Sequence, residues 1–218
     1  MQLAGVVAAQ VFETRELGGG LSVRQVSTYT YCWGAATPCT VWEPTGFSFG
    51  DVDALRTATA FARVPETGRI LAAITGTRPW RTVRSHAVLF SDDLGATWNA
   101  ARWEWLVSVR AIAFEPSGLR GAAGGDGGYV WISDDGGATW TERGSSAGTT
   151  YVDVARLGDV LVLVDAHGAA WRSRDRGFAR DSLTEGVVGP LRIEGGEIVV
   201  PSARGVVRVR DDGSVRRP

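Results

Sequence analysis

Short hydrophobic runs recur along this chain, and glycine, proline or aspartate bounds each run. The clearest segments are SVRAIAFEP (108–116), TYVDVARLG (150–158) and GDVLVLVDA (158–166), all rich in β-branched and aromatic residues. Such runs of about seven residues are typical of β-strands. Since no segment carries the long 3.6-residue period of a helix, the pattern predicts an all-β fold.

An eight-residue segment recurs among these strands. SDDLGATW (91–98) and SDDGGATW (133–140) start 42 residues apart, as 133 − 91 gives. SRDRGFAR (173–180) and VRDDGSVR (209–216) continue the series with declining similarity, and weaker copies stand at TRELGGGL (14–21) and near TVWEPTGF (40–47). Internal periods of about 40 residues indicate repeat architectures such as propellers, which have four strands in each blade.

The octapeptide can be interpreted as a tight turn between two strands. Its Asp carboxylate can accept bonds from backbone N–H groups, and its Gly permits the positive φ that such a turn requires. Its Trp returns on the outer strand, where the ring would be buried between neighbouring blades. This interpretation predicts structural roles for Ser91, Asp93, Gly95, Thr97, Trp98, Ser133, Asp135, Gly137, Thr139, Trp140, Ser173, Asp175 and Gly177.

The octapeptide resembles the Asp-box, also called the bacterial neuraminidase repeat, with the pattern S/T-x-D-x-G-x-T-W. Two copies match it fully and two are degenerate, so the resemblance covers roughly residues 54–217. It implies a β-propeller of four-stranded antiparallel blades. It does not select a function, because this repeat occurs in sialidases, other glycosidases, sorting receptors, photosystem assembly factors and many bacterial propellers.

The repeats predict how the single domain is divided into blades. Inner strands beginning near residues 54, 108, 150 and 189 define four blades within 54–218, and residues 1–53 would supply a divergent N-terminal blade. The terminal strands would then pair to close the ring. Five blades of about 40 residues each fit the 218 residues of the chain. A six-bladed ring, and an incomplete ring whose open edge is covered by a partner, are the alternatives.

Candidate binding residues are expected on the face opposite the octapeptide turns. There TGTRPWRTVRSH (75–86) places several guanidinium groups beside an indole. This combination suits recognition of a carboxylate, a phosphate, a sugar or a protein hot spot, and a solvated hairpin is the alternative. The candidates are Arg78, Trp80, Arg81, Arg84 and His86, with Trp103 and Trp105 from WEW and Asp165 and His167 from DAHG.

Two of these pairs allow contrasting interpretations. Trp103 and Trp105 lie on the same side of an extended strand, where they either pack beneath a neighbouring blade or form an exposed aromatic patch for a protein or glycan. Asp165 and His167 could serve as a general acid and base, although polar residues in a hairpin more often satisfy the geometry of the turn.

A glycosidase is the enzymatic alternative. Arg63-Val64-Pro65 resembles the Arg-Ile-Pro stretch that opens sialidase domains, and the resemblance then requires two further arginines, a Tyr paired with a Glu, and an acid-base Asp. None of Tyr29, Tyr31, Tyr129 and Tyr151 stands late in the chain beside a Glu. The sequence therefore favours a non-catalytic binding or scaffolding module, an accessory subunit of a larger assembly that is either membrane-attached or free. A lectin-like module for acidic glycans and a sialidase-like hydrolase are the alternatives.

The composition of the chain limits the classes of partner that it is expected to bind. The 23 basic residues, all arginine, and the 24 acidic residues leave a net charge of −1, which disfavours nucleic acid as the main ligand. No apolar run approaches the roughly 18 residues of a transmembrane helix, so protein partners are expected, with a membrane reached only through them. With two histidines and no ligand spacing in the chain, neither a cofactor nor a metal site is predicted.

The two cysteines give information about the cellular compartment of the protein. Cys32 and Cys39, in CWGAATPC, could form a disulfide, which suits a periplasmic or extracellular location. Two reduced thiols in the cytoplasm are the alternative. The N-terminal MQLAGVVAA lacks the basic segment of a signal peptide, so it gives no evidence of export.

Overall fold

The chain folds into antiparallel strands grouped in five sheets. The structure, a computed structural model, describes residues 11–28, 39–50, 55–56, 58–76, 85–101, 107–116, 118–177 and 179–217. The first sheet has three strands, β1 (Val11–Gly18), β2 (Leu21–Thr28) and β3 (Cys39–Thr45). The all-β prediction is confirmed.

Each of the other four sheets has four strands in chain order. The second comprises β4 (Ala60–Arg63), β5 (Ile70–Gly76), β6 (Ser85–Ser91) and β7 (Asn99–Ala100). The third comprises β8 (Val109–Phe114), β9 (Gly121–Gly125), β10 (Val130–Ser133) and β11 (Thr141–Gly144), with a 3-10 turn, η2 (Asp126–Gly128), between β9 and β10. The fourth comprises β12 (Tyr151–Leu157), β13 (Val160–Asp165), β14 (Ala170–Ser173) and β15 (Asp181–Thr184). The fifth comprises β16 (Arg192–Glu194), β17 (Glu197–Ser202), β18 (Gly205–Arg210) and β19 (Val215–Arg216).

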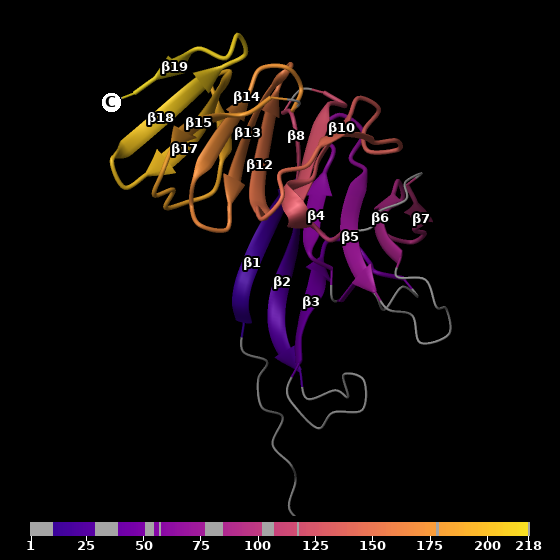
Figure 1. Ribbon diagram of the computed structural model, residues 1–218. Coiled ribbons are helices and arrows are strands. Elements are labelled where there is room, and N and C mark those ends of the chain that lie inside the picture. Colours follow the sequence, from indigo (N-terminus) through magenta and orange to yellow (C-terminus); the bar gives the residue numbers. More distant parts are fainter. Residues whose placement is uncertain are drawn as a thin grey trace, which may run out of the picture.

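The sheets follow one another along a curve, from the indigo first sheet through magenta and orange to the yellow fifth sheet (Figure 1). The described residues form four apolar clusters, one at each interface between consecutive sheets. Each sheet therefore buries its apolar side chains against its neighbours in the chain, as stacked repeats do.

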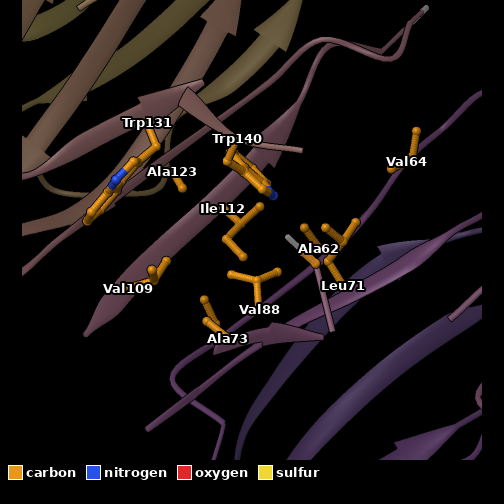
Figure 2. Packing of buried hydrophobic residues seen from close by; sticks show 12 residues of the cluster. Ala62, Val64, Leu71, Ala73, Val88, Val109, Ile112, Ala123, Trp131 and Trp140 are labelled. Atoms are coloured by element: carbon orange, nitrogen blue, oxygen red, sulfur yellow. The ribbon is translucent and has the colours of Figure 1, made fainter. Parts of the chain in front are cut away.

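The interface between the second and third sheets illustrates this packing. Figure 2 shows Leu71 and Val88 of the second sheet facing Ile112 and Trp140 of the third. Leu71 is fully buried, and Trp140 is 9% exposed. Side chains from two sheets thus interdigitate in one cluster, which is why neither sheet can bury its apolar face alone.

Polar side chains also join consecutive sheets. Arg156 on β12 is 1% exposed and donates to the carbonyl oxygens of Gly121 and Ser133 in the third sheet, at 3.0 and 2.8 Å. It also donates to Asp134 Oδ1 at 2.7 Å. Burial lowers the pKa of Arg156 from its ordinary value although Asp134 opposes the shift. On the other side of the fourth sheet, Asp153 Oδ2 accepts a bond from the Leu191 amide at 2.7 Å.

The ends of the chain differ from the expected ring closure. Within the described residues, β1 pairs only with β2 and β19 pairs only with β18, so the first and last sheets share no strand pairing there. The segment 14–21, predicted as a weak copy of the octapeptide, instead forms the end of β1 and a tight turn into β2, with positive φ at Gly18, Gly19 and Gly20. That prediction was wrong because three consecutive glycines can build a tight hairpin without an Asp.

Candidate functional site

The same pattern of hydrogen bonds recurs within each of three octapeptide turns. In the first, the Gly95 amide donates to Ser91 Oγ at 2.7 Å, and the hydroxyls of Ser91 and Thr97 donate to the Asp93 carboxylate at 2.8 and 2.6 Å. The turns at 133–140 and 173–180 repeat the Gly-to-Ser and Ser-to-Asp bonds. The bond from the Thr97 hydroxyl is the main cause that lowers the pKa of Asp93 to about 2. These carboxylates are thus occupied within their own turns.

The glycine of the second turn has a conformational and a steric role. Gly137 has φ 80°, which L side chains rarely adopt. A Cβ atom at this position would lie 2.3 Å from Leu71 Cδ2. The turn therefore packs directly against the second sheet.

The aromatic position of the octapeptide differs among the copies. Trp140 Nε1 donates to the Gly137 carbonyl at 3.0 Å, and its ring meets Phe114 edge-on with centroids 6.0 Å apart. Trp98 is half-buried and donates to the Ser48 carbonyl at 3.3 Å. In the third copy Arg180 takes this position, with its guanidinium 5.6 Å from the centroid of the Tyr151 ring. An arginine stacked on tyrosine there replaces the tryptophan.

The fourth copy is shorter than the sequence alignment suggested. Val209 pairs directly with Val215, and the turn between β18 and β19 comprises only residues 211–214. Asp212 Oδ1 accepts a bond from the Ser214 amide at 2.7 Å. An Asp and a Gly thus still mark the turn, but Val209 lies within the strand pairing, where the other copies begin their turn with serine.

The opposite end of the sheets carries the turns between β9 and β10, β13 and β14, and β17 and β18; we call this end the loop face. Most of the predicted binding residues of the 75–86 segment, Arg78, Trp80, Arg81 and Arg84, lie outside the described residues, as do Trp103, Trp105 and Cys32. For His86 the structure describes the backbone, which pairs with Thr75, and Cys39 begins β3. The described strands β5 and β6 end and begin, respectively, at the loop face.

Asp165 stabilises the turn between β13 and β14. It is 7% exposed; its Oδ1 accepts bonds from the amides of His167 and Ala169 at 2.9 and 3.0 Å, and its Oδ2 accepts one from Trp171 Nε1 at 3.0 Å. Burial opposes ionisation, but these donors outweigh it and lower the pKa of Asp165 from its ordinary value. The carboxylate is held as an anion that anchors the turn, and the bond that it accepts from His167 comes from the backbone amide.

The third sheet fixes another carboxylate on the loop face. Asp126, in the 3-10 turn η2, accepts two bonds from Arg110 of β8, both 2.9 Å long. This bond is the main cause that raises the pKa of Arg110. Arg110 lies at an irregularity in the pairing of β8 with β9, and Val152 occupies the corresponding irregularity in β12 with 45% of its surface exposed.

A hollow of about 530 Å³ opens between the outer strands of the fourth and fifth sheets, near the loop face. Exposed Arg204 and Arg217 contribute its positive charge and Glu185 its negative charge. Arg217 is partly held, because its Nη2 donates to the Leu183 carbonyl at 3.2 Å. The lining residues are Ser182, Leu183, Thr184, Glu185, Ser202, Arg204, Val207 and Arg217. A hollow with hydroxyls, a carboxylate and two guanidinium groups suits a polar, extended ligand.

Sequence reasoning missed both this hollow and the buried arginine at position 156. Residues from two sheets line the hollow, so no single segment of the sequence predicts it. Arg156 did carry a signal, since it interrupts the apolar residues of TYVDVARLG in the middle of a predicted core strand. A charged residue at such a position requires buried partners.

Comparison with known proteins identifies the fold. No protein-family profile matches the chain, and no curated protein matches its sequence. Among solved structures, a GH74 enzyme of Niastella koreensis superposes with a TM-score of 0.56 at 14% identity, over 95% of this chain and 30% of that chain. The fold is a β-propeller. The computationally designed Ika8 protein and YCF48 bound to D1 peptide each give a TM-score of 0.55 at 13% identity over 94% of this chain.

The propeller spans less than two thirds of the length of these structures, covering 57% of Ika8 and 65% of YCF48. In the described part of the chain, no helix is long and apolar enough to cross a membrane. The same residues include no group of three or more His, Cys, Asp or Glu side chains arranged to hold a metal ion.

Proposed function

We propose that this propeller is a non-catalytic binding module that takes an extended protein segment on its loop face. The observation that carries the proposal is the hollow between the fourth and fifth sheets, with Arg204, Arg217 and Glu185 around it. Its guanidinium groups and hydroxyls suit the carbonyl oxygens and carboxylates of a polypeptide. The similar folds include GH74 enzymes and a peptide-bound protein. The fold is therefore compatible with an enzyme and with a binding protein, and the choice between them rests on the residues of the site.

The positions of the ionisable groups support binding over catalysis. Asp165 is occupied by three hydrogen bonds within its turn, and Asp126 is paired with Arg110. Arg63, the residue on which the sialidase resemblance rests, ends β4 at the octapeptide end of the second sheet. Its guanidinium lies against the β1–β2 turn, because a Cβ on Gly19 would lie 3.1 Å from Arg63 Cζ. This arginine is thus remote from the loop-face hollow.

We propose that the chain belongs to the Asp-box propellers, because its two full octapeptide copies form the same hydrogen-bond pattern.

We further propose an oxidising compartment, periplasmic or extracellular, because the spacing of Cys32 and Cys39 would allow a disulfide. Trypsin leaves both cysteines in one peptide, 25–56, because it cleaves after Arg24 and Arg56. Mass spectrometry of this peptide without reduction tests the proposal: a mass lower by two hydrogens than that of the reduced peptide supports a disulfide, and two free thiols in natively isolated protein contradict it.

The binding proposal is tested by affinity isolation from the native source with the full chain as bait. We expect a protein partner to be recovered by the wild type and lost with Arg204→Glu, because the new carboxylate reverses the charge beside the hollow. Arg174→Glu is the matched control, since Arg174 is 59% exposed and belongs to the octapeptide turn of the fourth sheet. Equal recovery by both variants, or loss with Arg174→Glu alone, would contradict a loop-face site.

Two assays separate the alternatives. Turnover of fluorogenic glycosides, sialosides included, that disappears with Arg63→Ala would replace the binding module by a glycosidase. A glycan array decides the lectin alternative, in which the segment carrying Arg78, Trp80, Arg81 and Arg84 binds acidic sugars. We expect no glycosidase turnover and no array signal.

A further inference from the structure

The hollow between the fourth and fifth sheets lies against the edge of a strand. β15 is the last strand of the fourth sheet, so within the described residues no further strand pairs with its outer edge. Four consecutive residues, Ser182, Leu183, Thr184 and Glu185, carry this edge along the hollow. The unused N–H and C=O groups of a strand edge are a template for another strand. The hollow therefore borders a place where an extended polypeptide can pair.

Leu183 directs a backbone carbonyl toward the fifth sheet. In the register of β15 with β14, it is the residue that has no partner. Its side chain is buried in the cluster between the fourth and fifth sheets, and its carbonyl accepts a bond from Arg217 Nη2 at 3.2 Å. Since a carbonyl oxygen has two lone pairs, it can accept a second bond from the amide of an incoming strand.

The two arginines of the hollow differ from the other arginines of the fifth sheet. Those within its strands all form ion pairs with Glu194 or Glu197. Among the described residues, no ion pair includes Arg204 or Arg217. Glu185 is the one carboxylate of the lining, against these two guanidinium groups. The hollow thus has an excess of positive charge that the described part of the chain does not neutralise.

A second hollow shows that a position beside a short outer strand does not by itself bring charge. It has a volume of about 410 Å³, lies beside β7 and includes no charged side chain in its lining. The lining residues are Phe90, Asn99, Ala100, Ala138 and Thr139. The unpaired arginines therefore distinguish the hollow at β15, and they favour an anionic ligand there.

We propose that an acidic, extended segment of the partner adds to the outer edge of β15 as a further strand and places carboxylate side chains in the hollow with Arg204 and Arg217. Side chains alternate along a strand, so every second residue of the segment points into the hollow. The edge then supplies main-chain bonds and the arginines supply selectivity, as in other cases of strand addition. Because the same hollow is the site of the proposed function, strand addition rests on that function.

Fluorescence anisotropy with the full chain tests the acidic character of the segment. The probe is a labelled peptide, Ser-Val-Glu-Val-Glu-Val-Ser, whose glutamates share one face of an extended strand, and the control peptide has glutamine in their place. We expect the acidic peptide to bind with an affinity that falls as salt is added. The glutamine peptide should bind about tenfold more weakly. Equal binding of the two peptides, or binding of neither, would overturn the proposal.

N-methylation of the acidic peptide separates backbone pairing from attraction by charge alone. Methyl groups on the glutamate amides and on the valine amides block opposite edges of the extended peptide, because successive N–H groups of a strand point to opposite sides. We expect one methylated peptide to lose binding and the other to stay within about threefold of the unmodified peptide. Equal affinities of the two methylated peptides would contradict strand addition.

Two arginine variants test the charge of the hollow. Arg204→Gln should weaken binding of the acidic peptide about tenfold, because it removes an exposed guanidinium group. Arg216→Gln is the matched control: Arg216 is 64% exposed on the same sheet and lies 3.8 Å from Glu197, so its loss should change the affinity less than about twofold. Equal effects of the two variants would overturn the role of the hollow. Self-association in sedimentation that the acidic peptide abolishes would replace the partner's segment by a strand of a second copy.

Competition distinguishes strand addition from the proposed function as a whole. The partner is isolated with the full chain as bait, with and without an excess of the acidic peptide. Release of the partner by the acidic peptide and not by the glutamine peptide supports strand addition. A partner that Arg204→Glu loses but the acidic peptide does not release contradicts strand addition and leaves the proposed function in place. Recovery that does not depend on Arg204 contradicts the proposed function itself.

Discussion

Trp140 and Arg180 occupy the same position of the repeated turn, yet they hold neighbouring sheets together by different physics. Trp140 fills the cluster between the second and third sheets with an apolar ring. Arg180 reaches between the third and fourth sheets, stacks over Tyr151 and donates to the Gly128 carbonyl at 3.4 Å. A cation over an aromatic face adds attraction to the area it covers, so the octapeptide tolerates this exchange.

Replacing the buried tryptophan should lower stability strongly. Trp140→Ala removes a side chain that is 9% exposed and should reduce the free energy of unfolding by about 3–5 kcal/mol. Trp98→Ala should cost less, because Trp98 is only half-buried. Urea denaturation of the two variants measures the difference. A neutral Trp140→Ala would show that the ring does not support the interface between the sheets.

The octapeptide carboxylate predicts a pH dependence. The folded pKa of Asp93 is about 2, below its ordinary value of 3.8. Its contribution to stability is therefore present above pH 3.8 and is lost as pH falls through the folded pKa. We expect Asp93→Asn to melt below the wild type at pH 7 and to show a weaker fall in Tm between pH 4 and pH 2. Parallel Tm curves for both proteins over that range would contradict this role.

At the scale of elements, hydrogen bonds from charged side chains connect neighbouring sheets in addition to the apolar clusters between them. Arg156→Met would leave the Gly121 and Ser133 carbonyls without their donor. Because buried unsatisfied groups cost about 1–3 kcal/mol each, we expect the free energy of unfolding to fall by about 2–4 kcal/mol. Arg110→Met is the control: this pair with Asp126 is exposed, and its loss should cost less than about 1 kcal/mol. Equal losses in urea denaturation would show that Arg156 has no special role.

The sequence predicted the strands, but not the length of the fourth octapeptide turn or the contact made by Arg180. The continuous apolar run in GDVLVLVDA predicted β13, where every residue is buried. Burial on both faces of a strand leaves such a run. The octapeptide at 209–216 was aligned too long, since Asp and Gly mark a turn without fixing how many residues it contains. The contact of Arg180 could not be anticipated, because its partner Tyr151 begins β12, the first strand of the same sheet, 29 residues earlier in the chain.

At the scale of the whole molecule, the order of the sheets explains why the outer two differ from the inner three. The first and fifth sheets each contribute to one of the four apolar clusters, whereas the inner sheets each contribute to two. Polar residues cover the outer faces instead, including the Arg24–Glu43 pair on the first sheet and the ion pairs of Glu197 with Arg208, Arg210 and Arg216 on the fifth. Terminal repeats of stacked proteins need such polar outer faces for solubility.

This arrangement predicts graded protection in native-state hydrogen exchange. Amides of β9 and β13, in sheets packed on both faces, should exchange slowest, and those of β2 and β18 faster, because end repeats open without disturbing the others. Mass spectrometry of peptides from the free chain resolves these strands. Uniform protection in all five sheets would show that the propeller opens only as one cooperative unit.

The candidate site was only partly accessible to sequence reasoning. Asp165 and His167 lie in one turn of the loop face, but one hydrogen bond of Asp165 depends on the position of Trp171, which the sequence pattern alone cannot give. The hollow beside Arg204 forms only when the fourth and fifth sheets pack together. Turn chemistry is local and can be predicted, whereas a surface shared by two sheets depends on their packing.

Site-specific photo-crosslinking tests the binding-module account most directly. A photoreactive phenylalanine analogue replaces either exposed Ala203, on the loop face beside the hollow, or exposed Arg174, in the octapeptide turn of the fourth sheet. Each full-length protein is irradiated with the partner recovered by affinity isolation, and mass spectrometry identifies the linked peptides. The account predicts crosslinks from position 203 and none from position 174. Crosslinks from position 174 alone would place the partner on the octapeptide turns and contradict the account.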